Sequence, residues 1–212
     1  MQKLGVIGAG AWGTALAVVG RRAGRDVRLW ALEPEVVAEI NGRRSNPYLP
    51  GISLDPGIAA TGDLAAVADA DIVLLVTPAQ HLRGTCEKLK PLLKAGVPVV
   101  ICAKGIERGT SALMTDVVAE CLPDVPLMVL SGPTFAMEVA AGLPTAITLG
   151  ASDPDLARKV ALAIGSPGFR PYVSADIIGA EVGGAVKNVL AIGCGIVEGK
   201  GLGANGRAAL LA

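Results

Sequence analysis

A glycine-rich turn near the amino terminus is the first feature of this sequence that could do chemistry. The run Gly8-Ala9-Gly10-Ala11-Trp12-Gly13 fits the pattern G-x-G-x-x-G. Its glycines permit a tight turn, a close approach of the backbone to a pyrophosphate, and close packing of helix on strand. An apolar run at 4–10 enters the turn and a helical pattern follows, so free N–H groups at the helix start would face an anion. We expect Gly8, Gly10, Ala11, Trp12 and Gly13 to bind a dinucleotide; a merely structural turn is the alternative.

The next apolar run, 26–32, ends in residues that would meet the adenosine ribose of such a ligand. Glu33 stands where dinucleotide-binding domains place an acid that bonds the ribose hydroxyls, about 20 residues past the glycine turn. No arginine occupies the place that a 2′-phosphate would need, although Arg28 is near. We therefore expect Leu32 and Glu33 to favour NAD over NADP. A solvated loop charge at Glu33 is the alternative.

Two lysines occupy places where a charged side chain suggests a function. Lys104 follows the apolar run 97–102, at the carboxyl end of an expected strand, where open α/β sheets bind ligands. Lys187 lies in an apolar helical pattern with Gly183 and Gly184 close by, and small neighbours open space for a ligand. Two lysines that converge on one cleft suit a phosphorylated substrate, and each would lower the pKa of the other toward the range of a proton-transfer group. The alternatives are a loop charge at Lys104 and, at Lys187, a surface lysine whose ammonium extends into water.

Other polar residues give weaker signals. We expect His81 to be structural, and Glu138 and Glu181 to be exposed helix charges rather than acid–base groups. Ser131 lacks the G-x-S-x-G turn of a hydrolase. The four cysteines are dispersed and the chain has one histidine, so we expect free thiols and no metal site; they are Cys86, Cys102, Cys121 and Cys194.

Composition places the chain among globular proteins with a large apolar core. Apolar residues make up 51% of its 212 residues, and 19 basic residues balance 19 acidic ones. Nothing in this balance favours nucleic acid as a partner. Continuous apolar runs fall short of the roughly 18 residues that a membrane helix needs. Glycines interrupt the amino-terminal apolar run, which argues against a signal peptide. We predict a cytoplasmic protein without an integral membrane segment.

Short apolar runs alternate with helical patterns as far as residue 173. The expected strands are 4–10, 26–32, 71–76, 97–102, 127–130, 145–149 and 169–173. The expected helices are 12–24, 34–41, 63–68, 82–94, 110–121, 135–141 and 153–164, and a loop rich in proline and glycine occupies 42–57. This alternation predicts a doubly wound α/β domain of Rossmann type with a mainly parallel sheet. Pro78, just after the run 71–76, is expected to shape the floor of the cofactor site.

The pattern changes after residue 174. Residues 176–198 form one long helical pattern, a loop rich in Gly and Asn follows at 199–206, and 207–212 starts another helix. We predict a dinucleotide-binding domain over 1–175. Residues 176–212 would be the start of an all-helical substrate domain that is cut off at Ala212.

Five segments in a fixed order carry a family resemblance. They are Trp12 inside the glycine turn, N-P-Y-L-P-G at 46–51, A-K-G at 103–105, S-G-P-T-F-A at 131–136 and G-G-A-V-K-N at 183–188. Together they resemble the NAD(P)-dependent glycerol-3-phosphate dehydrogenases of bacterial type, over nearly the whole chain. The resemblance implies reversible hydride transfer between NAD(P)H and dihydroxyacetone phosphate to give sn-glycerol 3-phosphate, which feeds glycerophospholipid synthesis.

The same resemblance implies roles for individual residues. Lys187 would donate and accept the proton, Lys104 would contact both cofactor and substrate, and Gly132, Thr134 and Ala136 would line the same cleft. Members of this type often carry a basic residue where Leu32 stands, which puts use of NADP in doubt here. Other substrate-binding groups of the family lie in a complete helical domain beyond Ala212, so we expect this chain to bind cofactor with little activity of its own.

Two other functions remain open from the sequence. A non-catalytic dinucleotide-binding module, such as a redox sensor, would need neither Lys187 nor a substrate cleft. A related two-domain hydroxyacid dehydrogenase would share the glycine turn but would prefer a carboxylate substrate to a phosphate. In either enzyme the partner is a small molecule, and a homodimer is a further expectation.

Overall fold

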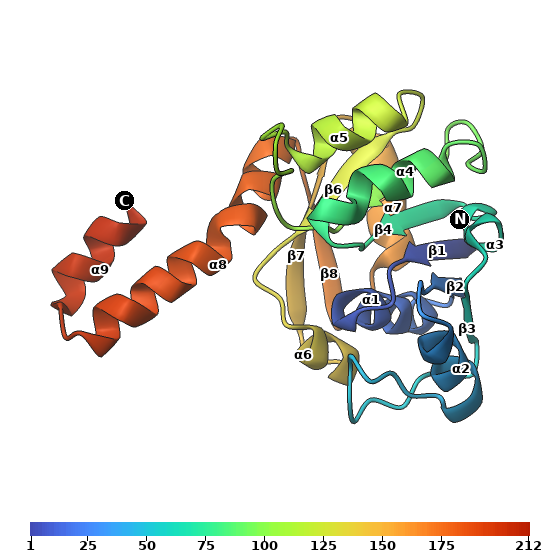
Figure 1. Cartoon of the computed structure of the whole chain (residues 1–212), viewed down its shortest axis with the longest axis horizontal. Helices are drawn as coiled ribbons and strands as arrows, with labels where there is room; N and C mark the ends of the chain where they lie inside the picture. Colours follow the sequence, from blue (N-terminus) through green and yellow to red (C-terminus); the bar gives the residue numbers. More distant parts are fainter.

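An eight-stranded sheet organises the first 174 residues of the computed structural model, which describes residues 1–212 (Figure 1). The strands are β1 (Lys3–Ile7), β2 (Asp26–Trp30), β3 (Ile58–Thr61), β4 (Ile72–Leu75), β5 (Val99–Ile101), β6 (Leu127–Ser131), β7 (Thr145–Ala151) and β8 (Phe169–Ser174). Their order in the sheet is β3-β2-β1-β4-β5-β6-β7-β8. The first six strands are parallel, whereas β7 runs antiparallel to β6 and parallel to β8. The predicted Rossmann-type, mainly parallel sheet is confirmed.

Helices cover both faces of this sheet. They are α1 (Ala11–Arg22), α2 (Pro34–Arg43), α3 (Leu64–Ala68), the short 3-10 helix η1 (Ala79–His81), α4 (Leu82–Leu89), α5 (Met114–Cys121), α6 (Ala136–Ala141) and α7 (Pro154–Ile164). Alternate residues of β4 enter opposite cores: Ile72 packs with residues of α1, α2 and α7, and Val73 with residues of α3, α4 and α5. All four residues of β4 are buried because both of its faces are covered.

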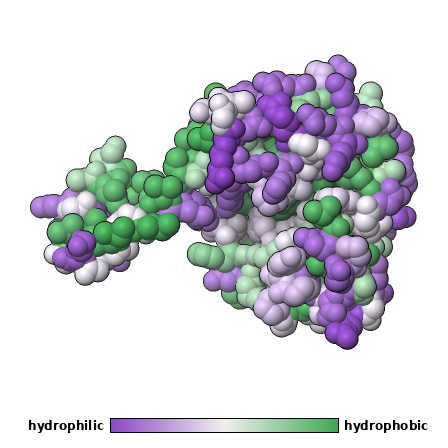
Figure 2. Space-filling view, viewed as in Figure 1, coloured by the Kyte–Doolittle hydropathy of each residue, from purple (hydrophilic) through white to green (hydrophobic).

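Two further helices form an arm that projects from the sheet domain (Figure 1). Helix α8 spans Ile177–Gly199, and α9 (Gly203–Leu211) folds back along it, where Gly193 lies against the Leu210 side chain. Figure 2 shows that much of the arm is apolar at its surface, and the exposed side chains include Val189, Ile192, Ile196 and Leu211. By length and composition alone α8 could cross a membrane, because its 23 residues contain a window of mean hydropathy 1.4. Uninterrupted apolar runs in the sequence do not single out this helix, because Gly, Glu, Lys and Asn residues divide it.

Some predicted boundaries were wrong, each for a local reason. Strand β3 was missed because its sequence, I-A-A-T, carries a weak apolar signal, and it forms through pairing with β2. Helix α4 ends at Leu89, five residues early, since Pro91 cannot continue a helix. Helix α5 begins at Met114 rather than 110, because Ser111 takes a positive φ of 59° in a turn. Helix α9 begins four residues earlier than expected, at Gly203.

Close packing beneath β1 leads to a first prediction. A Cβ on Gly5 would collide with the carbonyl oxygen of Val67, whereas nothing lies within 4 Å of a Cβ built on Gly42 in α2. We expect Gly5→Ala to lower the free energy of unfolding by about 1–3 kcal/mol through overpacking. Gly42→Ala should raise it by about 0.5–1 kcal/mol, because alanine restricts the unfolded chain and suits a helix. Urea unfolding of both variants measures the contrast, and equal effects would contradict the packing of β1 against α3.

Candidate active site

The glycine turn between β1 and α1 takes the conformation that its sequence predicts. Gly8 has a φ of 116°, and a Cβ there would meet the backbone of Val76 and Thr77 at 2.9 Å. A Cβ on Gly13 would collide with the Gly8 carbonyl oxygen. Gly10 is the N-cap of α1, and the space where its Cβ would lie is open. The turn therefore presents unsubstituted backbone and the positive end of a helix to that space.

A buried asparagine from the loop after α2 holds this turn in place. Asn46 is 1% exposed, and its Nδ2 donates hydrogen bonds to the Ala9 carbonyl at 2.9 Å and to Thr14 Oγ1 at 2.8 Å. The backbone N–H of Tyr48 donates to Asn46 Oδ1 at 2.9 Å. From the sequence, Asn46 stood out only as part of the N-P-Y-L-P-G segment, without this role. An Asn-Pro pair in a long loop is too common a signal to have shown it.

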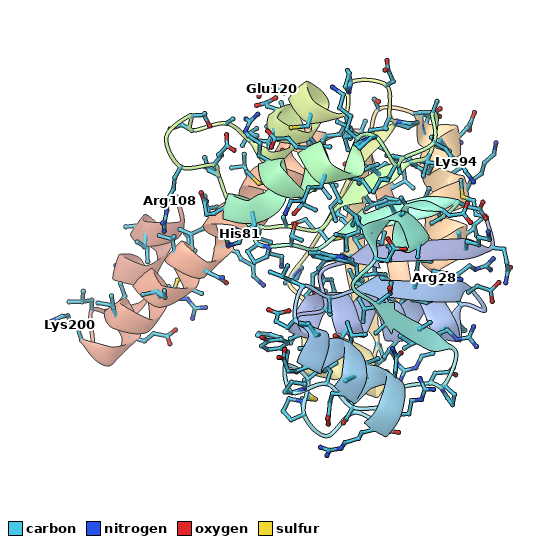
Figure 3. All side chains as sticks on the ribbon, turned by 45° about the vertical axis from the view of Figure 1, so that its right-hand side comes forward. Arg28, His81, Lys94, Arg108, Glu120 and Lys200 are labelled. Atoms are coloured by element: carbon cyan, nitrogen blue, oxygen red, sulfur yellow. The ribbon has the colours of Figure 1, made fainter.

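A cleft of about 730 Å³ opens in front of the turn, where the strand order reverses between β1 and β4. Open α/β sheets bind ligands at this reversal. Eight predicted cofactor residues line the cleft: Gly8, Gly10, Ala11, Trp12, Gly13, Leu32, Glu33 and Pro78. His81, at the start of α4, is also among the lining residues, and Figure 3 labels it. Arg28, which Figure 3 places on β2, instead lines a separate hollow with Lys3 and Asp69.

A second hollow of about 300 Å³ adjoins the first and shares Trp12 and Pro78 with it. Lys104, Thr134 and Ala136, which the family resemblance places in one cleft, all line this second hollow. Three buried side-chain atoms in the chain lack a hydrogen-bond partner, namely Trp12 Nε1, Thr77 Oγ1 and Thr134 Oγ1. All three belong to residues that line this hollow. Because buried polar atoms are almost always bonded, their concentration here indicates the place of a polar ligand.

Lys104 lies on the loop after β5 and is partly buried. Its Nζ donates a hydrogen bond to the Gly132 carbonyl at 3.2 Å. Burial first, and then the positive charge of Lys187, lowers the pKa of Lys104 to about 8. The loop is tied down beyond the lysine, because Arg83 forms two hydrogen bonds of 2.9 Å with the Glu107 carboxylate. Lys104 can therefore exchange its proton at a pH not far above neutral.

Lys187 reaches the same place from α8. It lines a third hollow of about 300 Å³ with Ser131, Gly132 and Gly184, and it is close enough for its positive charge to lower the pKa of Lys104. Its Nζ lies over the Phe135 ring, 5.7 Å from the ring centre, at a distance that allows a cation–π interaction. The structure therefore brings together the two lysines that the sequence singled out. Phe135, which is 67% exposed, was not among the predicted site residues.

One expectation about the carboxylates was wrong. Glu138 is exposed, as predicted, but Glu181 is buried, with 4% of its surface accessible. Its carboxylate accepts hydrogen bonds from Thr115, which a helical pattern read from the sequence could not reveal. The structure contains no group of three or more His, Cys, Asp or Glu side chains arranged to hold a metal ion.

We call the three hollows a row: the first two share lining residues, and Lys104 of the second bonds the carbonyl of Gly132, which lines the third together with Lys187. Backbone N–H groups and a helix N-terminus lie at one end, unpartnered polar side chains in the middle and two cations at the other end. Such a row can bind a long anionic ligand and present a proton donor to a smaller anion beside it.

Comparisons with known proteins agree along the whole chain. Residues 3–157 match the family model described as the NAD-dependent glycerol-3-phosphate dehydrogenase N-terminus, and residues 176–212 match the model of its C-terminus. A protein of Paramagnetospirillum magneticum named glycerol-3-phosphate dehydrogenase, NAD(P)+, is 65% identical over 212 residues, which cover 100% of this chain and 77% of the relative. A protein of the same name from Caulobacter vibrioides is 60% identical over 99% of this chain and 64% of the relative.

A solved structure gives the same result. The crystal structure of glycerol-3-phosphate dehydrogenase from Coxiella burnetii superposes with a TM-score of 0.90 at 39% identity, over 99% of this chain and 65% of that one. The chain thus spans about two thirds of the length of such relatives. The matched family models, the identities and the shared fold together show that this chain belongs to the NAD-dependent glycerol-3-phosphate dehydrogenase family.

Proposed function

We propose that this chain takes part in hydride transfer between NAD(P)H and dihydroxyacetone phosphate to give sn-glycerol 3-phosphate, a step that feeds glycerophospholipid synthesis. The observation that carries the proposal is the proximity of Lys104, which lines the hollow adjoining the glycine-turn cleft, to Lys187, which lines the next hollow. In this scheme residues 1–175 bind the cofactor and residues 176–212 begin the substrate domain.

The residues present fit a nicotinamide dinucleotide. Gly10 leaves open space at the N-terminus of α1 for a pyrophosphate, and Leu32 and Glu33 lie at the end of the cleft suited to an adenosine ribose. The bound cofactor would supply the hydride. Trp12, Pro78 and Ala136 would then enclose its nicotinamide end, since they line the middle hollow.

The lysines supply what the reduction of a ketone needs from the protein. A developing alkoxide requires a positive charge and a proton, and in our proposal Lys187 donates that proton. Lys104, held by the Gly132 carbonyl, would contact both cofactor and substrate and hold the substrate's phosphate with its charge. Gly132 and Thr134 would form the wall beside the substrate.

The two rival functions account for less of this geometry. A dinucleotide-binding module without catalysis leaves the convergence of two lysines unexplained. A hydroxyacid dehydrogenase shares the fold, but two adjacent cations suit a dianionic phosphate better than a single carboxylate. A cytoplasmic location stays a prediction that rests on buried free thiols at Cys86, Cys102 and Cys121. A homodimer also stays a prediction, which the exposed apolar surface of α8 and α9 would support.

Calorimetric titration with NADH and NADPH tests the cofactor site. We expect NADH to bind this chain more tightly than NADPH, because Glu33 would repel a 2′-phosphate and Leu32 offers it no cation. Leu32→Arg should bring the affinity for NADPH up to that for NADH or beyond. If a folded chain binds neither nucleotide, the proposed function fails; if it binds both equally, only the role of Leu32 and Glu33 fails.

The unpartnered hydroxyl of Thr77 gives a prediction with opposite signs for stability and binding. Thr77→Val removes a buried group that has no partner, so the free chain should unfold at the same or a higher temperature. Its affinity for NADH should fall by about five- to tenfold, roughly 1–1.4 kcal/mol, because a bond to the cofactor is lost. Thr85→Val is the control: Thr85 Oγ1 already donates to the His81 carbonyl at 2.9 Å, so this variant should be destabilised. A Thr77→Val chain that binds NADH like wild type would contradict the assignment.

The lowered pKa of Lys104 predicts how phosphate binding depends on pH. Because its folded-state pKa is about 8, below that of an unfolded lysine, the folded chain gains stability as pH rises above 8 while the unfolded chain still holds the proton. Binding of sn-glycerol 3-phosphate to the NADH complex should weaken over the same range, since neutral Lys104 attracts no phosphate. At pH 8 binding should take up about half a proton, measured by calorimetry in buffers of different ionisation enthalpy. Lys104→Met should abolish this uptake; uptake that survives would exclude Lys104 as its source.

A further inference from the structure

Glu181 is a buried carboxylate without a cationic partner. Both of its oxygens are used: Oε1 accepts a hydrogen bond from the Thr115 backbone N–H at 2.9 Å, and Oε2 accepts one from Thr115 Oγ1 at 2.6 Å. None of the chain's ion pairs involves it. Glu181 lines none of the three hollows of the candidate site, so it does not face a ligand there.

The start of α5 explains how a carboxylate is tolerated at this depth. Thr115 lies in the first turn of α5, where backbone N–H groups have no partner within the helix and the helix dipole is positive. Charge-assisted hydrogen bonds to such groups are stronger than neutral ones. Glu181 therefore serves α5 as a capping group that comes from another helix, 66 residues further along the chain.

This contact lies where the first turns of α8 attach to the sheet domain, beside Ile177 and Ala180, which pack against the core. In the 23 residues of α8 only Glu181 and Gly184 are buried. Gly184 lies directly against Ser131 at the end of β6, where a Cβ would come within 2.5 Å of Ser131 Oγ. Three residues beyond Gly184 comes Lys187. Each step of three residues falls about 60° short of a full helical turn, so these positions follow one stripe from α5, past β6, toward Lys104.

We propose that Glu181 is a positioning residue that fixes the rotation of α8 about its axis, so that Lys187 faces Lys104. Burial and the nearby Lys187 lower the pKa of Lys104, and the charge of Glu181 is not among the causes. The carboxylate acts through the angle at which it holds the helix. The catalytic role of Lys104 and Lys187 rests on the proposed function. The geometric link between Glu181 and Lys187 does not depend on it.

An NMR titration tests this link without any measurement of catalysis. The pKa of Lys104 is followed through the ¹³Cε resonances of the ¹³C-labelled 212-residue chain, with Lys104→Arg used for assignment. In Glu181→Ala, α8 loses this constraint on its rotation and Lys187 moves away, so we expect the pKa of Lys104 to rise above about 8, while burial, the larger cause of the shift, keeps it below that of a free lysine. Glu181→Gln keeps the side-chain length and an accepting oxygen, so its Lys104 should titrate within a few tenths of a unit of wild type.

A matched pair at the other end of the contact covers the case in which Glu181→Ala does not fold. Thr115→Val removes the hydroxyl bond and keeps the N–H bond, so it should raise the pKa of Lys104 by a smaller amount than Glu181→Ala. Thr115→Ser keeps both bonds and should titrate like wild type. NADH affinity should stay within about twofold in all four variants, because the glycine turn lies in a different part of the chain.

The outcomes separate the two proposals. An unchanged Lys104 titration in a folded Glu181→Ala chain, or in Thr115→Val if the former does not fold, overturns the positioning role of Glu181 and leaves the proposed function untouched. A raised pKa in both variants, with wild-type behaviour in Glu181→Gln and Thr115→Ser, supports it even if the chain binds no sn-glycerol 3-phosphate.

Discussion

The absence of a side chain at Gly13 is the constraint on which the site depends. The carbonyl oxygen of Gly8 occupies the space that a Cβ on Gly13 would need. Because Gly13 has no Cβ, the turn from β1 into α1 can be short. This close turn aims the N-terminus of α1 at the place where the strand order reverses. Asn46 then fixes the turn through the Ala9 carbonyl, at the expense of burying an amide that is fully bonded. The position of the cleft in front of α1 is therefore set by this turn.

The far end of the row is assembled differently, from segments that lie far apart in the sequence. Lys104 comes from a loop after β5, Phe135 from the loop before α6, and Lys187 from the arm helix α8. Their mutual arrangement depends on how α8 docks on the sheet domain, and few buried groups do that docking. In our proposal, the tightly packed glycine turn holds the cofactor, and the more lightly attached α8 carries the proton donor.

Local sequence patterns predicted much of this architecture. The alternation of apolar runs with helical patterns predicted the doubly wound sheet. The helix predicted at 153–164 is also confirmed, and Asp153 accepts bonds from two backbone N–H groups at its start. Failures came where structure depends on distant partners. Strand β3 exists because β2 lies beside it, and Glu181 is buried because α5 presents its N-terminus there. The lysine pair could be anticipated from chemistry and family resemblance, but not the phenyl ring beside it, because an exposed phenylalanine carries no sequence signal.

The three unbonded polar atoms around the middle hollow bear on how long the protein survives as well as on what it binds. Each one leaves the free chain short of a hydrogen bond that its ligand would complete. Occupancy would therefore raise the free energy of unfolding by an amount set by ligand concentration relative to its dissociation constant. Proteases act on opened chains, so turnover of this protein would track the supply of the dinucleotide. A cell short of that dinucleotide would then hold less of the protein itself.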